Sequence, residues 1–266
     1  MKKIVLFDMD GTLTPPRKEL DRDLVPALRE LAKISDIGIV TGSDHNYVLQ
    51  QMGLLMRNSE IRYKLHILPC NGTKYYPPPQ AAAHTHELAF QKNMREELGE
   101  LQFTTIMRFI LQRQAQLHLY NIPMTGHFID YRGSMINWCP IGRNASEVDR
   151  KRFEEFDKPD NSFRMDEIKS FKNFLKRKNL DNILEVKLGG ETSFDIYPKG
   201  WDKTFALQHF EDYQCWFVGD RCGENGNDQA IYERLRVYGK SFEVKTTKET
   251  LKLIFDEIIP RIANDK

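Results

Sequence analysis

The sequence predicts an α/β fold in which a parallel sheet carries the reactive groups and a separate α+β segment is inserted into it. Short apolar runs recur at residues 4–7, 37–40 and 215–218, and each leads into polar residues. Such runs are too short for helices and are typical of strands buried on both faces. Segments with helical periodicity separate the runs, and a proline cluster followed by alternating segments interrupts the series.

The opening run leads directly into Asp8 and Asp10, and Gly11 follows. In open α/β sheets, ligands bind just beyond the carboxyl ends of the strands. Side chains at i and i+2 leave one face of an extended segment, so both carboxylates can reach one point. Two carboxylates repel each other unless a cation neutralises them, and Mg²⁺ prefers such oxygen ligands. One of them can attack phosphorus as a nucleophile, and the other can carry a proton.

The composition excludes several classes of protein. The chain has 266 residues, enough for one large domain or two small ones. Lys plus Arg is 39 and Asp plus Glu is 38, so the net charge of +1 gives no general attraction to nucleic acid or membrane. The four cysteines form no C-x-x-C pair, which argues against zinc and against a disulfide framework. No apolar stretch is long enough to span a membrane, and we expect a soluble cytoplasmic enzyme.

The remaining core segments add three candidate groups. Arg17 lies on a proline-stiffened loop close to the first acids. Asp21 or Asp23 is expected to cap the next helix. The second strand ends at Thr41–Gly42–Ser43, where the Ser43 hydroxyl and free N–H groups suit a phosphoryl oxygen or, alternatively, an ordinary helix cap.

The inserted segment is predicted to be an α+β cap with an antiparallel sheet and helices. The proline run at residues 77–79 marks the boundary, so we expect the core domain to comprise residues 1–82 and 200–266 and the cap residues 83–199. A helix-like segment spans about 90–101, and another lies around 106–111. Residues 128–132 and 135–139 flank a Gly-Ser turn and indicate a β-hairpin.

Two arginines and a polar strand of the cap are candidate ligands for a sugar phosphate. Arg143 and Arg150 are seven residues apart at the start of a helix capped by Asn144 or Ser146, which predicts similar faces. Arginine forks bind phosphate oxygens, although Arg150 can instead belong to a solvated basic patch. Ser193 and Asp195 share one strand face and offer a hydroxyl and a carboxylate to sugar hydroxyls. The alternative is an edge strand with its polar face in water.

The chain then returns to the core with a lysine and two further acids. Lys203, at the start of a predicted helix, can hold a phosphate or a carboxylate as a point charge. Residues 215–218 repeat the opening pattern and end at Gly219–Asp220. Asp220 is therefore the expected third metal ligand, and Asp228 is expected to hold the site together.

These motifs together resemble one family. Asp8-x-Asp10-Gly11-Thr12-Leu13-Thr14 resembles the first motif of the haloacid-dehalogenase-like phosphotransferases. Pro140-Ile141-Gly142-Arg143, Gly189-Gly190 with Ser193-Phe194-Asp195, and Trp201-Asp202-Lys203 follow in the order seen in the eukaryotic-type phosphomannomutases. The resemblance spans almost the whole chain.

The resemblance implies a Rossmann-like haloacid-dehalogenase core with an inserted cap, and a homodimer joined through the caps. It implies interconversion of mannose 6-phosphate and mannose 1-phosphate for GDP-mannose synthesis, with Mg²⁺ and a hexose 1,6-bisphosphate activator. Asp8 would be the phosphorylated nucleophile and Asp10 the general acid/base. Asp8, the Asp10 backbone carbonyl and Asp220 would hold Mg²⁺. The implied sugar-phosphate ligands are Arg17, Arg132, Arg143, Arg150, Ser193 and Asp195.

Two alternatives to a mutase remain. Thr41 stands where these mutases tend to carry glycine, and threonine is closer to the phosphatases of the superfamily. A Mg²⁺-dependent sugar-phosphate phosphatase is therefore the first alternative. A non-catalytic sugar-phosphate sensor is the second, although intact Asp8, Asp10, Lys203 and Asp220 argue against it.

Overall fold

The chain forms two units, each built on its own sheet. The structure is a computed structural model that describes residues 1–58, 60–117, 120–158 and 162–264. The first unit comprises Met1–Gln91 and Trp201–Lys266, and the second comprises Lys92–Gly200. The first unit extends past residue 82 because β5 (Phe90–Gln91) pairs antiparallel with β4 (Lys74–Tyr75).

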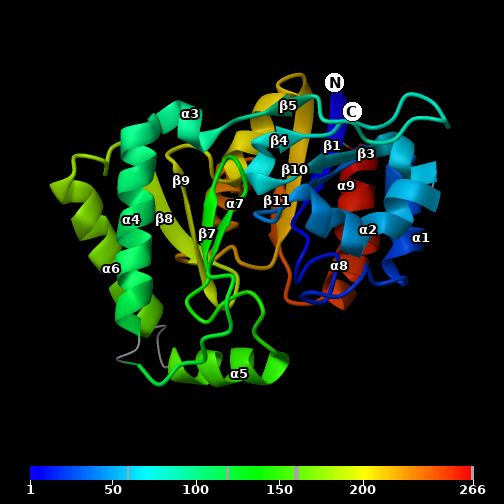
Figure 1. Ribbon diagram of the computed structural model, residues 1–266. Coiled ribbons are helices and arrows are strands. Elements are labelled where there is room, and N and C mark those ends of the chain that lie inside the picture. The colour runs from blue at the N-terminus through cyan, green and yellow to red at the C-terminus, as the bar shows by residue number, and fades with distance from the viewer. Residues whose placement is uncertain (59, 118–119, 159–161, 265–266) are drawn as a thin grey trace. The chain divides into compact units, whose positions relative to one another are not determined.

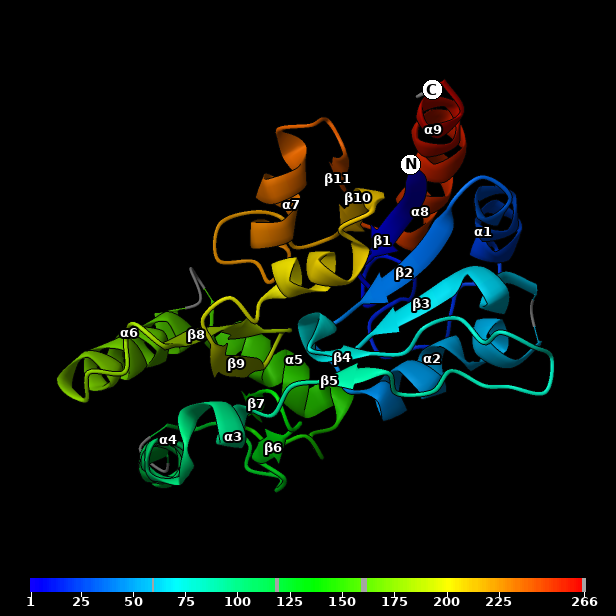
Figure 2. The same ribbon diagram turned by 90° about the horizontal axis from the view of Figure 1, so that it is seen from above.

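The sheet of the first unit has five parallel strands in the order β11-β10-β1-β2-β3, which lie side by side in Figure 2. The strands are β1 (Lys2–Phe7), β2 (Asp36–Val40), β3 (Leu65–Leu68), β10 (Tyr213–Gly219) and β11 (Ser241–Glu243). The apolar runs predicted as strands from the sequence thus all occur. The chain leaves β1 toward β2 and β3 on one side and later adds β10 and β11 on the other.

The central strand β1 is buried on both faces, as expected for a parallel sheet. Val5 and Phe7 belong to the hydrophobic cluster formed with α1, α2, η5 and α9 on one side. Ile4 and Leu6 belong to the cluster formed with η4 and α7 on the other. The apolar run with no polar interruption follows from this double burial.

The helical segments of the first unit cover both faces of its sheet. They are α1 (Leu24–Ala32), α2 (His45–Asn58), η1 (Glu60–Lys64), η2 (Cys70–Gly72), η4 (Lys203–Phe210), α7 (Gln229–Arg236), α8 (Thr247–Leu253), η5 (Ile254–Ile258) and α9 (Ile259–Asn264). Asp23 occupies the N-cap of α1 but makes no capping bond with its side chain. Instead, the Asp21 carboxylate accepts a hydrogen bond from the backbone N–H of Asp23 at 3.1 Å.

The sheet of the second unit is antiparallel, with the order β6-β7-β9-β8. Its strands are β6 (Ile129–Tyr131), β7 (Ile136–Trp138), β8 (Leu184–Gly189) and β9 (Ser193–Pro198). The predicted hairpin is present as β6 and β7. Every residue of β9 is buried between two neighbouring strands, so the alternative of a solvated edge strand is wrong for Ser193 and Asp195.

Four helices accompany this sheet: α3 (Met94–Leu98), α4 (Glu100–Gln116), α5 (Glu147–Phe156) and α6 (Ser162–Arg177). In Figure 1, α4 and α6 lie side by side, and Phe109 stacks on Phe174 with ring centroids 3.9 Å apart. The helix expected from about residue 90 is shorter, because residues 90–91 pair as a strand and Asn93 caps α3.

The fold class predicted from the sequence, a parallel α/β core with an inserted antiparallel α+β unit, is confirmed by these two sheets. All four cysteines are free thiols. Among the described residues, no helix has both the length and the apolar character needed to cross a membrane.

Candidate functional site

The first candidate site lies where β1 and β10 end side by side. Asp8 follows β1 and Asp220 follows β10, and the register pairs Phe7 with Val218. The backbone N–H of Asp8 donates to the Val218 carbonyl at 2.9 Å, which extends the pairing to the acid itself. The chain departs from β1 and β10 to opposite sides of the sheet, so this is the switch point at which open α/β sheets bind ligands.

Three carboxylates and one ammonium gather at this point. Ligand oxygens of Asp8, Asp220 and Asp228 all lie within 4.8 Å of one another. The Lys203 Nζ is fully buried and donates to the carboxylates of Asp8 and Asp228, the latter at 2.5 Å. Although burial alone would lower the pKa of Lys203, the charges of Asp228 and Asp8 raise it, so the side chain stays protonated. With all four groups ionised, the cluster carries a net charge of −2.

The cluster fits a divalent cation. The Asp220 Oδ1 atom is buried and has no hydrogen-bond partner within the described part of the chain. Burial, together with the negative charge of Asp228, raises the pKa of Asp220 to about 6. Burial likewise raises the pKa of Asp8 well above its usual value, despite the charge of Lys203. Mg²⁺ prefers carboxylate oxygens such as these, which repel one another when no cation is bound. The +2 charge of the ion balances the net charge of −2 on the cluster.

Gly11 allows the loop after β1 to pass close to Asp220. Its φ is +86°, a left-handed conformation that favours glycine. A Cβ atom at this position would lie 2.3 Å from Asp220 Oδ2 and 2.7 Å from its Cγ. The glycine of the motif is therefore required both by the backbone and by contact with the acid of the neighbouring strand.

Asp10 is held apart from this cluster by three donors. Its Oδ1 accepts hydrogen bonds from the Arg17 backbone N–H at 3.0 Å, the Tyr47 hydroxyl at 3.1 Å and the Gln51 amide at 3.4 Å. The structure thus brings Arg17 and Asp10 together through the backbone of Arg17. Tyr47 and Gln51, one helical turn apart on α2, were not predicted from the sequence. The signal available in the sequence was their spacing of four residues, which places both side chains on one face of a helix.

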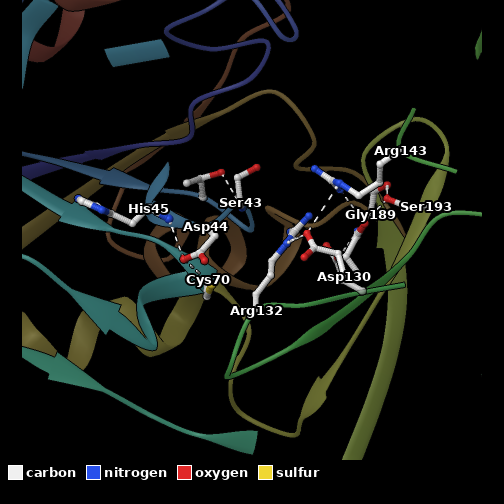
Figure 3. Close-up of polar contacts among 12 residues, drawn as sticks. Ser43, Asp44, His45, Cys70, Asp130, Arg132, Arg143, Gly189 and Ser193 are labelled. Carbon is white, nitrogen blue, oxygen red and sulfur yellow. Dashed lines mark hydrogen bonds and ion pairs between the residues drawn. The ribbon is translucent and has the colours of Figure 1, made fainter. Parts of the chain in front are cut away.

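The end of β2 carries Ser43 beside a small polar network, drawn in Figure 3. The Ser43 N–H donates to Thr41 Oγ1 at 3.1 Å, and the Ser43 carbonyl accepts from the Cys70 N–H at 3.0 Å. Asp44 accepts from Lys74 Nζ at 2.7 Å. Ser43 therefore lies at the carboxyl edge of the same sheet as Asp8, as predicted.

The second candidate site is a polar face of the sheet in the second unit. Asp130, Asn137, Asp195 and Lys187 lie opposite one another on β6, β7, β9 and β8, one from each strand. The apolar neighbours Trp138 and Phe194 stack with centroids 4.8 Å apart. Because side chains alternate along a strand, the polar residues share the other face.

Arg132 and Arg143 converge on Asp130, as Figure 3 shows. Arg132 Nε donates to Asp130 Oδ2 at 3.0 Å, and Arg143 Nε lies 3.7 Å from the same oxygen. Burial and the positive charge of Arg132 lower the pKa of Arg143. Two guanidinium groups beside the same carboxylate offer forked N–H donors and positive charge, which suit a phosphate.

Arg150 supports the segment that carries Arg143. Ser146 caps α5 in a capping box with Asp149, so Arg143 precedes the helix, and the expectation that both arginines share a helix face is wrong. Arg150 instead donates to the carbonyls of Ala145 and Arg143 at 3.2 and 3.1 Å and to Thr192 Oγ1 at 3.0 Å. Arg143 and Arg150 are therefore in contact through the hydrogen bond from the Arg150 guanidinium to the Arg143 carbonyl.

Ser193, Asp195 and Arg143 are linked by Asn137, which was not predicted from the sequence. Its amide contacts all three side chains, and it is 3% exposed. The signal available in the sequence was its position between the apolar residues Ile136 and Trp138, which places it on the opposite face of the strand.

Comparisons with known proteins give a consistent result. The family model described as eukaryotic phosphomannomutase matches residues 24–259. A phosphomannomutase of Dendrobium officinale is 36% identical over 95% of this chain and 94% of its own. A phosphomannomutase of Schizosaccharomyces pombe is 35% identical over 96% and 95% of the two chains.

Two solved structures share the fold alone. IMP-nucleotidase of Plasmodium falciparum, in an IMP-bound mutant form, has a TM-score of 0.65 at 15% identity and covers 95% of this chain and 68% of its own. Trehalose-6-phosphate phosphatase of Aspergillus fumigatus has a TM-score of 0.53 at 16% identity, with coverage of 99% and 93%.

Proposed function

This chain belongs to the eukaryotic phosphomannomutase family, and on that premise we propose that it interconverts mannose 6-phosphate and mannose 1-phosphate for GDP-mannose synthesis. The family and the class of enzyme predicted from the motifs are confirmed by this membership. The family also implies Mg²⁺ and a sugar-phosphate substrate.

The observation that carries the proposal is the cluster of Asp8, Lys203, Asp220 and Asp228 at the switch point. Asp8 is the proposed nucleophile because it ends the central strand and its carboxylate is buried beside a fixed ammonium. Asp8, Asp220 and the Asp10 carbonyl would hold Mg²⁺, with Asp228 in contact with the same cluster. The ion would supply positive charge to the phosphoryl group during transfer.

In the proposed reaction, an Asp8 oxygen bonds to one phosphorus of a hexose 1,6-bisphosphate while the bond from that phosphorus to the sugar oxygen breaks, which leaves a hexose monophosphate. Asp10 gives a proton to the departing sugar oxygen and takes one back in the return step. The donors on Asp10 Oδ1 support this role, because they fix one oxygen and orient the carboxyl group. A hexose monophosphate must then present its free hydroxyl oxygen to the aspartyl phosphate, where that oxygen bonds to phosphorus, the bond to Asp8 breaks and a bisphosphate forms again.

The polar face of the second unit is the proposed site for the sugar phosphate. Arg132 and Arg143 supply positive charge, and Ser193 and Asp195 supply acceptors for sugar hydroxyls. Arg17, Ser43 and Arg150 are proposed to contribute as well. From the family resemblance we also propose a hexose 1,6-bisphosphate activator, a homodimer through residues 83–199, and a cytoplasmic location.

A ³¹P NMR time course tests the proposal. The protein is mixed with mannose 1-phosphate, Mg²⁺ and glucose 1,6-bisphosphate. A mutase produces the resonance of mannose 6-phosphate without inorganic phosphate, whereas a phosphatase produces inorganic phosphate. A sensor binds the sugar and leaves its spectrum unchanged over time.

Two controls complete the experiment. Asp8→Asn should abolish turnover while leaving the circular dichroism spectrum unchanged, and EDTA should stop the reaction until Mg²⁺ is restored. Accumulation of inorganic phosphate in proportion to substrate loss would favour the phosphatase, the alternative suggested by Thr41, which is buried with its hydroxyl bonded to the Ser43 N–H.

A further inference from the structure

Asn137 lies at the centre of the polar face in the second unit. It is on β7, opposite Asp130 of β6 and Asp195 of β9. Its side chain is 3% exposed, and each polar atom of the amide has a partner. A buried amide with all its bonds made is a rigid element.

Three hydrogen bonds of this amide end on groups proposed to bind the sugar phosphate, and a fourth, at 3.5 Å, reaches the Phe194 carbonyl. Nδ2 donates to Ser193 Oγ at 2.9 Å and to Asp195 Oδ1 at 2.7 Å. Oδ1 accepts from Arg143 Nη1 at 2.8 Å. The reverse orientation would place a carbonyl oxygen against the Asp195 carboxylate and an NH₂ group against the guanidinium, so the bonding partners fix the orientation.

These bonds also decide whether the Ser193 hydroxyl donates or accepts a hydrogen bond toward a ligand. The Ser193 hydroxyl donates its single proton to the Gly189 carbonyl and accepts from Asn137. A hydroxyl has one proton and two lone pairs, so toward a ligand Ser193 can only accept. An ionised Asp195 is likewise only an acceptor. A ligand that binds these two side chains must therefore supply the hydrogen-bond donors.

We propose that Asn137 is a positioning residue that sets the specificity of this face, an inference that rests on the proposed function. Its carbonyl orients Arg143 for a phosphate, and its NH₂ group makes Ser193 and Asp195 matched acceptors. The ligand class is a phosphorylated sugar whose ring hydroxyls donate hydrogen bonds. An analogue with fluorine in place of a recognised hydroxyl cannot donate and is rejected.

The test variant is Asn137→Leu, which keeps the approximate volume of the side chain and removes every hydrogen bond of the amide. Asn144→Leu is the matched control, because Asn144 is an exposed asparagine of the same unit whose amide donates to the Thr125 carbonyl at 3.3 Å. Steady-state kinetics and calorimetric binding are measured with mannose 1-phosphate and with its 2-, 3- and 4-deoxyfluoro analogues.

The wild-type protein should discriminate against at least one analogue by roughly tenfold to a hundredfold, the effect of one hydrogen bond to a charged group. In Asn137→Leu, the KM and the dissociation constant for mannose 1-phosphate should rise by roughly tenfold or more, with kcat changed far less. The discrimination against that analogue should fall to within about threefold, because neither acceptor is held in place. A purely structural role would instead weaken all ligands equally.

Several outcomes overturn the inference. Kinetics and discrimination in Asn137→Leu equal to those of Asn144→Leu would reject it while leaving the proposed function intact. A wild-type protein that binds mannose 1-phosphate without turning it over rejects the proposed function, and the binding ratios still decide on Asn137. A wild-type protein that binds no hexose phosphate rejects both. If Asn137→Leu does not fold, Asn137→Ser removes the Arg143 acceptor with less disturbance, and the same ratios apply.

Discussion

Replacing Gly11 with alanine should weaken the cation site although no proposed ligand is itself replaced. The new Cβ would lie 2.3 Å from Asp220 Oδ2 and 2.7 Å from Asp220 Cγ, distances that real contacts do not tolerate. Asp220 would have to move away from the cluster that it forms with Asp8 and Asp228. The loop itself would also be strained, because its φ of +86° disfavours alanine.

The expected loss of stability in Gly11→Ala has two contributions. A left-handed backbone costs an alanine roughly 1–2 kcal/mol of stability. The inserted methyl group costs a further 1–3 kcal/mol or so, through overpacking. Displacing a carboxylate that orients or binds a metal typically costs about tenfold to a hundredfold in metal affinity. The Mg²⁺ concentration for half-maximal turnover should rise by about that factor.

Gly239→Ala is the control for backbone strain. Its φ is +68°, and an added Cβ would meet nothing within 4 Å. The assays are urea unfolding for both variants and a Mg²⁺ titration of mannose 1-phosphate conversion. Gly239→Ala should lose stability but keep the wild-type Mg²⁺ requirement. If Gly11→Ala is folded and has the same Mg²⁺ requirement as Gly239→Ala, the contact between Gly11 and Asp220 has no part in metal binding.

Three further predictions concern charged side chains that are buried or half-buried. Lys203→Met leaves the carboxylates without their ammonium. It should lower the free energy of unfolding in urea by about 3–5 kcal/mol and remove most of the turnover. Recovery of full stability on adding Mg²⁺ would contradict this prediction. Arg150→Ala should lower phosphohexose conversion roughly tenfold to a hundredfold through lost charge-assisted bonds, while acetyl phosphate hydrolysis changes far less. Equal loss of both activities would place Arg150 in the core chemistry. Arg164→Met should destabilise the second unit by about 3–5 kcal/mol by stranding buried Asp157, and adding Asp157→Leu should recover most of the loss in the same unfolding assay.

The parallel strands were predictable from the sequence because double burial leaves an unbroken apolar run. The run at residues 4–7 shows this, since its side chains enter two different hydrophobic clusters. The burial of Ser193 and Asp195 was harder to predict, because polar and apolar residues alternate in the same way in an edge strand and in an inner one. Only the pairing of β9 with β7 and β8 decides the matter. Residues 90–91 were assigned to a helix because a two-residue strand has no period to detect.

The acids at the strand ends were predictable because topology brings the carboxyl ends of neighbouring parallel strands together. Asp8 and Asp220 lie together for that reason. Asn137 was not predictable, because its importance depends on partners 6 to 58 residues away in the chain. The position of Arg143 was misjudged since the capping box starts α5 at Ser146, and sequence alone left Asn144 and Ser146 as equal candidates.

The pairing of β1 with β10 has a consequence for how this protein matures during synthesis. β1 is translated well before β10, whose pairing with it begins at Tyr213, so its neighbour on that side emerges only after the whole second unit. Closing so long a loop is slow, and until then one edge of β1 stays unpaired. The second unit is continuous in sequence and can fold earlier. The acidic cluster cannot form until Asp220 and Asp228 have been translated, so truncated chains that end before Asp220 keep only Asp8 of its three carboxylates.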